Sequence, residues 1–241
     1  RARLEEVKRA GRPVFVLSRT LTSPTARAAV EAFLAAWGGR LVEHDPDAEP
    51  VSAILEAQAI LTGRALAPSL DLASTDVLVS LGTDLLGAGP DPVVLTAAWS
   101  ARRRDTSRPA FRHVHVEGTL SLTGANADER WPASAAERRL VALWLLRHLV
   151  ALTPGAEPAR LGPVLGELPA LGSLAARVES LAAELAAARS RSLLVTATDD
   201  PAEALAVALA NRVLGNEGRT LDLERPSLVR RGLDRDVAAF L

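Results

Sequence analysis

The sequence predicts a doubly wound α/β fold, in which a mainly parallel sheet is covered by helices on both faces. Short apolar runs that are typical of buried strands alternate with longer segments whose apolar residues have helical spacing. The segments between the apolar runs are long enough for helical crossovers, which connect parallel strands. These two observations together indicate repeated βαβ units.

Six short segments are predicted to be strands, within one α/β domain that covers residues 1–241. Each is rich in apolar residues and is bounded by residues that favour turns or helix starts. They lie near residues 13–17, 40–44, 76–81, 111–116, 193–196 and 219–222. Residues 153–172 are rich in proline and glycine, and we expect them to form an irregular excursion before the fifth strand.

Capping chemistry predicts where the helices begin. A polar residue stands directly before proline at 23–24, 91–92 and 200–201, which suits an N-cap followed by the first helical residue. Ser134 and Glu137 form a capping box, in which the two side chains satisfy orphan amides reciprocally. The expected helices cover residues 26–37, 51–61, 91–103, 134–152, 173–190 and 200–214.

Composition excludes several kinds of chemistry. The 241 residues include no cysteine, which rules out disulfides, a cysteine nucleophile and an iron–sulphur cluster held by this chain alone. The net charge of −1 gives no electrostatic bias towards nucleic acid. No apolar run reaches the roughly 20 residues that span a bilayer, so we expect a soluble chain without membrane insertion. Because the chain does not begin with methionine, we expect it to be a fragment of a longer protein.

Ligands of doubly wound folds bind beyond the carboxyl ends of the strands, which makes four loops the candidate binding region. These loops cover residues 18–23, 82–90, 117–131 and 197–200. The glycine-rich loop 82–90 would let a phosphate approach the backbone, although it fits neither the dinucleotide fingerprint nor the P-loop. The alternative, which we favour, is a flexible turn between a strand and a helix.

His113 and His115 alternate with valines, so both imidazoles are expected on one face of a strand. Two histidines could begin a metal site, but spacing supplies no further ligand. We therefore expect a partly exposed sheet face here, and no metal site.

Two charged groups have similar alternatives. Residues 102–104 are three arginines at a predicted helix end, where we expect solvated cations, with an anion site as the alternative. Asp45, Asp47 and Glu49 follow the second strand, where an acidic side chain can hold a ribose hydroxyl. The neighbouring prolines favour a plain turn. No serine–histidine–aspartate arrangement, nucleophile elbow or carboxylate pair is evident, so no catalytic residue is predicted.

The segment EGTLSLTGANADERW at 117–131, followed by the capping box at 134–137, resembles the molybdopterin oxidoreductase superfamily. It is most similar to the molybdopterin-like domain in the large iron–sulphur subunit of alternative complex III, a quinol-oxidising respiratory assembly. Three further segments resemble that branch in the same order. They are TSPT at 22–25, DVLVSLGTDLLGAGP at 76–90 and ANRVLGNEGRT at 210–220. The resemblance implies a Rossmann-like, degenerate molybdopterin-oxidoreductase domain.

Departures from the family pattern define the expected function. Catalytic relatives have a glycine before the helix start, where this chain has PASA at 132–135, and Gly118 replaces their usual proline after the strand-end acid. In the alternative complex III branch this region is a scaffold that has lost its cofactor, and a separate ferredoxin-like region holds the clusters. The resemblance therefore implies a non-catalytic domain without a cofactor. Its partners would be other subunits of a membrane-bound electron-transfer complex, in a periplasmic or membrane-peripheral location.

Two alternatives remain open. One is a domain of an active molybdenum oxidoreductase that binds molybdopterin guanine dinucleotide, with Glu117 on a ribose and Asn126 or Asp128 on the base or phosphate. The cofactor-binding residues would then be Ser18, Thr22, Ser23, Gly82, Thr83, Asp84, Glu117, Thr123, Asn126 and Asp128. The other alternative is a stand-alone module that binds a nucleotide or a small anion.

Overall fold

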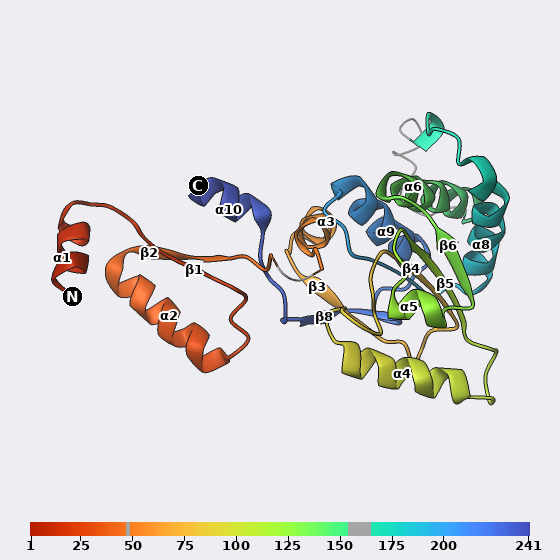
Figure 1. Cartoon of the computed structure of the whole chain (residues 1–241), viewed down its shortest axis with the longest axis horizontal. Helices are drawn as coiled ribbons and strands as arrows, with labels where there is room; N and C mark the ends of the chain where they lie inside the picture. The colour runs from red at the N-terminus through yellow and green to blue at the C-terminus, as the bar shows by residue number, and fades with distance from the viewer. Residues whose placement is uncertain (47–48, 154–164) are drawn as a thin grey trace.

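A computed structural model describes residues 1–46, 49–153 and 165–241. Its main body contains a four-stranded, entirely parallel sheet in the order β6-β5-β4-β7, flanked by helices (Figure 1). The strands are β4 (Val77–Leu81), β5 (Arg112–Glu117), β6 (Glu129–Pro132) and β7 (Ser192–Thr196). This arrangement confirms the predicted doubly wound α/β fold.

Helices cover both faces of this sheet. They are α4 (Pro92–Arg104), α5 (Leu122–Asn126), α6 (Ala135–Leu152), α8 (Ala175–Ala187) and α9 (Pro201–Val213), with a 3₁₀ turn η2 at Gly172–Leu174. Helix α3 (Ser52–Thr62) packs on α9. Val79 and Leu81 point to the face covered by α6, α8 and α9, whereas Leu78 points to the face covered by α4. Successive side chains of a strand alternate between faces, so the largely apolar sequence of β4, in which Ser80 is the one polar residue, follows from burial on both sides.

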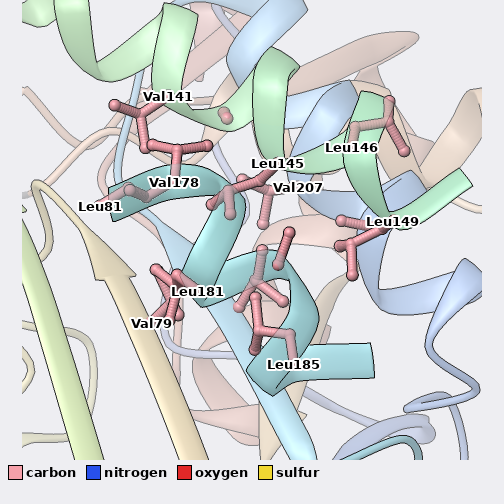
Figure 2. Packing of buried hydrophobic residues seen from close by; sticks show 14 of the residues in the cluster. Val79, Leu81, Val141, Leu145, Leu146, Leu149, Val178, Leu181, Leu185 and Val207 are labelled. Atoms are coloured by element: carbon pink, nitrogen blue, oxygen red, sulfur yellow. The ribbon is translucent and has the colours of Figure 1, made fainter. Parts of the chain in front are cut away.

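The larger core lies between the sheet and the α6–α8–α9 layer (Figure 2). Leu145 of α6 and Leu181 of α8 are almost completely buried and point towards Val79 of β4. Helix α8, which lies within the helix predicted at 173–190, thus packs on the chain's own sheet through its larger apolar residues.

The N-terminal strands form a separate sheet, which corrects the prediction for residues 13–17 and 40–44. Strands β1 (Val14–Ser18) and β2 (Gly39–Glu43) pair in parallel with each other alone, and α2 (Pro24–Trp37) packs against them. Figure 1 shows this unit apart from the main body, with α1 (Ala2–Arg9) and α10 (Asp234–Phe240) beside it. Its apolar run is not buried, since Phe15 is 37% and Leu17 is 53% exposed. Phe15 also contacts Phe240 of α10 edge to face.

A third sheet also departs from the prediction. Strand β8 (Leu221–Ser227) pairs antiparallel with β3 (Ala67–Leu70), and neither belongs to the parallel sheet. The strand predicted near 219–222 overlaps β8 only at residues 221–222, and β8 continues to Ser227 in a different sheet. Strands β3 and β6 were not predicted, because each is four residues long and contains proline, and β6 also carries charged residues.

Most of the predicted excursion at 153–172 falls on residues 154–164, which lie outside the described residues. Within the described ranges, no helix combines the length and the apolar character needed to cross a membrane.

Candidate functional site

The strand order reverses between β4 and β7, because the chain adds β5 and β6 on one side of β4 and later adds β7 on the other. Such a switch point creates a crevice at the carboxyl ends of the strands. A cavity of about 240 Å³ lies here, lined by residues after β4, the end of β7 and parts of α3, α4 and α9. Of the predicted cofactor-binding residues, only Thr83 lines it.

The loop after β4 is held by its own neighbours. The Glu49 carboxylate accepts hydrogen bonds from Thr83 Oγ1 at 2.8 Å and from the Asp84 amide at 2.6 Å. The Asp84 carboxylate accepts from the amide and hydroxyl of Thr123 at 2.9 and 2.7 Å. Gly82 has a positive φ of 68°, and a Cβ there would lie 2.2 Å from the Arg138 guanidinium. These contacts describe a turn between a strand and a helix, as we expected, but the turn is held in place by hydrogen bonds and is not the flexible one that was predicted.

Glu117, at the carboxyl end of β5, is 4% exposed and already has several donors. It accepts hydrogen bonds from Arg130 Nε at 2.6 Å, His115 Nε2 at 2.9 Å and the Ser121 amide at 3.1 Å. Burial alone would raise the pKa of Glu117, but the hydrogen bonds from Arg130, Ser121 and His115 outweigh it and lower the pKa to about 2. Glu117 is therefore an ionised acceptor whose partners all belong to this chain.

His113 and His115 share one face of β5, as predicted, but that face is fully buried rather than partly exposed. Ser80 of β4 lies between them, with its Oγ 2.7 Å from His113 Nε2 and 2.5 Å from His115 Nδ1. Trp99 Nε1 donates to His113 Nδ1 at 3.2 Å. Because His113 Nδ1 accepts from Trp99, the proton of His113 is assigned to Nε2, which donates to Ser80. Ser80 then donates to His115 Nδ1, and His115 Nε2 donates to Glu117, so the hydrogen bonds run in one direction from Trp99 to Glu117.

Burial shapes the chemistry of both rings. Desolvation and the neighbouring His115 lower the pKa of His113 to about 3. Desolvation also lowers the pKa of His115, against the opposing effect of Glu117. Ser80 is completely buried, so its contact with His115 does not make an accessible nucleophile. Within the described ranges, no group of three or more histidine, cysteine or acidic side chains is arranged to hold a metal ion.

The arginines at the end of α4 are not all solvated, which corrects the prediction for residues 102–104. Arg102 is 3% exposed and donates to Asp76 Oδ1 at 2.7 Å and to the Thr75 carbonyl at 2.9 Å. Arg108 and Arg191 donate to the same carboxylate. Burial opposes these hydrogen bonds, but they lower the pKa of Asp76. The anion beside Arg102 is therefore a side chain of this chain.

The acidic segment after β2 also pairs internally. Asp45 accepts from the amide and hydroxyl of Thr20 at 2.9 and 2.7 Å, and Glu49 binds the loop after β4 as described. Asp47 lies outside the described residues. These contacts agree with a turn and leave neither Asp45 nor Glu49 without donors.

The predicted binding residues do not form one site. Gly82, Thr83, Asp84, Glu117 and Thr123 come together at the carboxyl ends of β4 and β5.

The other predicted residues lie elsewhere. Ser18, Thr22 and Ser23 belong to the N-terminal unit, where Ser23 caps α2. Asn126 Nδ2 donates to the Leu122 carbonyl of its own helix at 2.8 Å. Asp128 accepts from Arg103 NH1 at 2.6 Å and from the His113 amide at 2.7 Å.

A buried ion pair beside the switch point was missed. Glu203 of α9 has no exposed surface and accepts from Arg138 Nε of α6 at 2.9 Å and from Thr196 Oγ1 at 2.5 Å. Burial raises the pKa of Glu203, and the hydrogen bonds from Thr196 and Arg138 oppose that rise. The sequence indicates only that Glu203 lies in the first turn of a helix. Arg138 is distant from it in the sequence, so no local pattern predicts that the two side chains pair.

No protein-family model matches the chain, and no curated protein matches its sequence. Solved structures do match. Acetylene hydratase from Pelobacter acetylenicus aligns with a TM-score of 0.56 and 12% identity, over 87% of this chain and 30% of that one. A formyltransferase/hydrolase complex from Methylorubrum extorquens, solved with methylofuran, aligns with a TM-score of 0.51 and 17% identity, over 88% of this chain and 55% of that one. The chain thus spans well under two thirds of either structure, and the likeness concerns the α/β fold.

Proposed function

We propose that this chain is a non-catalytic domain of the molybdopterin-oxidoreductase type, which serves as a scaffold in a respiratory, quinol-oxidising electron-transfer complex. The fold shared with acetylene hydratase gives weak support to a domain of the molybdopterin-oxidoreductase type. The ordered sequence motifs support the same assignment independently. The observation that carries the proposal is Glu117. The side chain that the resemblance assigns to a ribose is buried against this chain's own arginine, histidine and backbone amide.

The surroundings of Glu117 do not fit the guanine dinucleotide form of molybdopterin. A Cβ on Gly124 would lie 1.9 Å from Glu117 Oε1, so helix α5 packs directly over the carboxylate at Gly124. The Arg138 guanidinium lies similarly close over Gly82, where a phosphate would have to approach the backbone. A ribose would have to displace Arg130 and leave a buried charge without its partner, which is costly. We therefore assign no reaction step to this domain.

The proposed partners are other subunits or domains of a membrane-bound complex in a periplasmic or membrane-peripheral location. Iron–sulphur clusters would belong to another part of the protein, because this chain has no cysteine to ligate them. Exposed apolar side chains on the surface of the main body support contacts with other chains. Val93 and Val94 at the start of α4 are 82% and 66% exposed, and Leu120 beyond β5 is 62% exposed.

Bound pterin tests the proposal directly. The chain would be purified from a host that makes molybdopterin guanine dinucleotide, denatured and oxidised, and its supernatant examined for pterin fluorescence. We expect none above the background of an unrelated protein. Fluorescence in stoichiometric amount would overturn the scaffold function and favour the active-enzyme alternative.

The gene itself offers a second test. Sequence that continues beyond residue 241 into closely spaced cysteine motifs of the ferredoxin type is expected for the iron–sulphur subunit. A gene that stops there without such motifs would contradict the role in an electron-transfer complex, and a stand-alone module would be favoured.

A further inference from the structure

The segment between β8 and α10 borders the cavity at the switch point. It covers residues 228–233, which form neither helix nor strand, and we call it the strap. Val229 and Arg230 of the strap line the cavity together with parts of α3, α4, α9 and β7. Movement of the strap away from the main body would therefore remove a part of the cavity wall.

Arg230 attaches the strap to two other segments of the main body. Its guanidinium donates from NH1 to the Glu49 carbonyl at 3.0 Å and from NH2 to the Ala88 carbonyl at 3.2 Å. Glu49 precedes α3 and itself lines the cavity, and Ala88 belongs to the loop after β4. Because hydrogen bonds from a charged donor are stronger than those between neutral groups, this one side chain holds three segments together.

The strap also contacts the N-terminal unit. The Arg231 amide donates to Thr20 Oγ1 of that unit at 2.8 Å. The Asp234 amide, at the start of α10, donates to Ser52 Oγ at the start of α3 at 2.9 Å. Figure 1 shows that the chain runs here from β8, at the main body, to α10, beside the N-terminal unit. The same few residues thus border the cavity and connect it with the N-terminal unit.

Apolar packing contributes little to holding the strap in place. Leu228 is 58% exposed and Val229 is 36% exposed, so these two side chains bury only a part of their surface. A segment with few buried apolar contacts opens locally at a lower free energy than the whole protein unfolds. The hydrogen bonds of Arg230 therefore have a large influence on how often the strap opens.

We propose that the strap is a gate of the cavity and that Arg230 is its latch. When Arg230 leaves its two carbonyl acceptors, residues 228–233 move away from the main body as one unit, which opens the cavity and breaks the contact with Thr20. The structure is the closed state of this gate. The proposal does not depend on the scaffold function, because the contacts of the strap do not involve Glu117.

A single introduced thiol reports on access to the cavity, because the chain has no cysteine of its own. Ala197 lines the cavity and is 8% exposed, so Ala197→Cys places a thiol in the wall. Adding Arg230→Met, which keeps a long side chain but removes the donors, should make iodoacetamide modify this thiol about tenfold faster. Mass spectrometry measures the rate. Ala208→Cys, in the wall formed by α9, repeats the measurement if the first variant does not fold.

Two controls separate the gate from a general loss of stability. Arg225→Met changes an arginine of β8 whose side chain is 91% exposed and pairs with Asp222, so it should leave the labelling rate at Ala197→Cys unchanged. Ala182 is completely buried in the larger core. A thiol at Ala182→Cys should react no faster when Arg230→Met is added.

Amide hydrogen exchange tests whether the strap moves as one unit. In Arg230→Met the amides of Arg231 and Asp234 should exchange faster, by about the same factor as the thiol at residue 197 is labelled faster. The Leu194 amide, which donates to Asn211 Oδ1 in the interior, should exchange at the rate of the wild-type chain.

Four results would overturn the proposal. The first is an unchanged labelling rate of the cavity thiol in Arg230→Met, and the second is the same increase in Arg225→Met. The third is an equal increase at Ala182→Cys, which would indicate general destabilisation. The fourth is unchanged exchange of the Arg231 amide, which would show that the cavity opens without movement of the strap.

Discussion

Lowering the pH from about 7.5 to about 5 should destabilise the protein through its buried histidines. His113 has no exposed surface, and desolvation lowers its pKa from 6.5 to about 3. Between these two values the unfolded chain binds a proton that the folded chain does not. The stabilisation from His113 is therefore complete above about pH 6.5 and is lost as the pH falls towards 3.

The expected size of the effect follows from that shift. At pH 5, which is about 1.5 units below the pKa of the unfolded histidine, that histidine is protonated while His113 stays neutral in the fold. The free energy of unfolding therefore falls by about 2 kcal/mol. His115 acts in the same direction, because its pKa is also lowered. Glu203 acts in the opposite direction, because its pKa is raised and the fold takes up its proton first. The low pKa of Glu117 matters only below about 4.5, outside this range.

A variant separates His113 from the other groups. His113→Gln keeps a polar side chain but cannot titrate, so its free energy of unfolding should fall about 2 kcal/mol less than that of wild type between the two pH values. Urea titrations at both pH values measure this difference. His148→Gln is the control, because His148 stacks on Trp144 of α6, away from the chain of hydrogen bonds through Ser80. The same pH dependence in wild type and His113→Gln would refute the reasoning.

Three further substitutions test the interior. Asp76→Ala removes the carboxylate beside Arg102, whose side chain is 1% exposed, and should cost about 3–5 kcal/mol in urea unfolding; a cost below about 1 kcal/mol would contradict burial of that pair. Gly124→Ala places a methyl group 1.9 Å from Glu117 Oε1 and should cost about 1–3 kcal/mol. Calorimetry measures that loss, and an unchanged melting temperature would show that α5 is not packed on the carboxylate. Leu181→Ala opens a cavity between α8 and the sheet and should cost about 2–5 kcal/mol; chemical denaturation that gives less than about 1 kcal/mol would disprove tight packing there.

The strongest local signals predicted the centre of the main body. The run at 77–81 is β4, in which every residue is buried, and the cap at Ser134 begins α6 through both hydrogen bonds of the capping box. These features depend on neighbours a few residues away, so a sequence displays them completely.

Membership of a sheet could not be predicted in the same way. The run at 13–17 is a strand, but it pairs with β2 and not with the main sheet. An apolar strand pattern indicates burial and gives no information about the partner. The partial exposure of Phe15 and Leu17 shows that the pattern also overestimated burial in this two-stranded unit.

The buried polar groups depend on register, which the sequence does not display. Ser80 bridges the two histidines because it pairs with His115 across β4 and β5, so a shift of one residue would turn it to the other face. Arg138 and Glu203 come from two helices that pack together, and the capping pattern at Glu203 gives no indication of a distant arginine. Chemistry of this kind becomes visible only when the topology is known.

The pairing of Glu117 within the chain and the missed strand β6 have one cause. An acidic residue at the end of a strand can bind a ligand only when no side chain of the protein already pairs with it. Whether it is paired depends on the neighbouring strand. Arg130, which pairs with Glu117, comes from β6, where it is the register partner of His115. The four residues of β6 combine two charges with a buried Trp131 and a proline, so no strand pattern was visible. Had that strand been predicted parallel to β5, Arg130 would have been placed beside Glu117, and an internal ion pair would have been expected there.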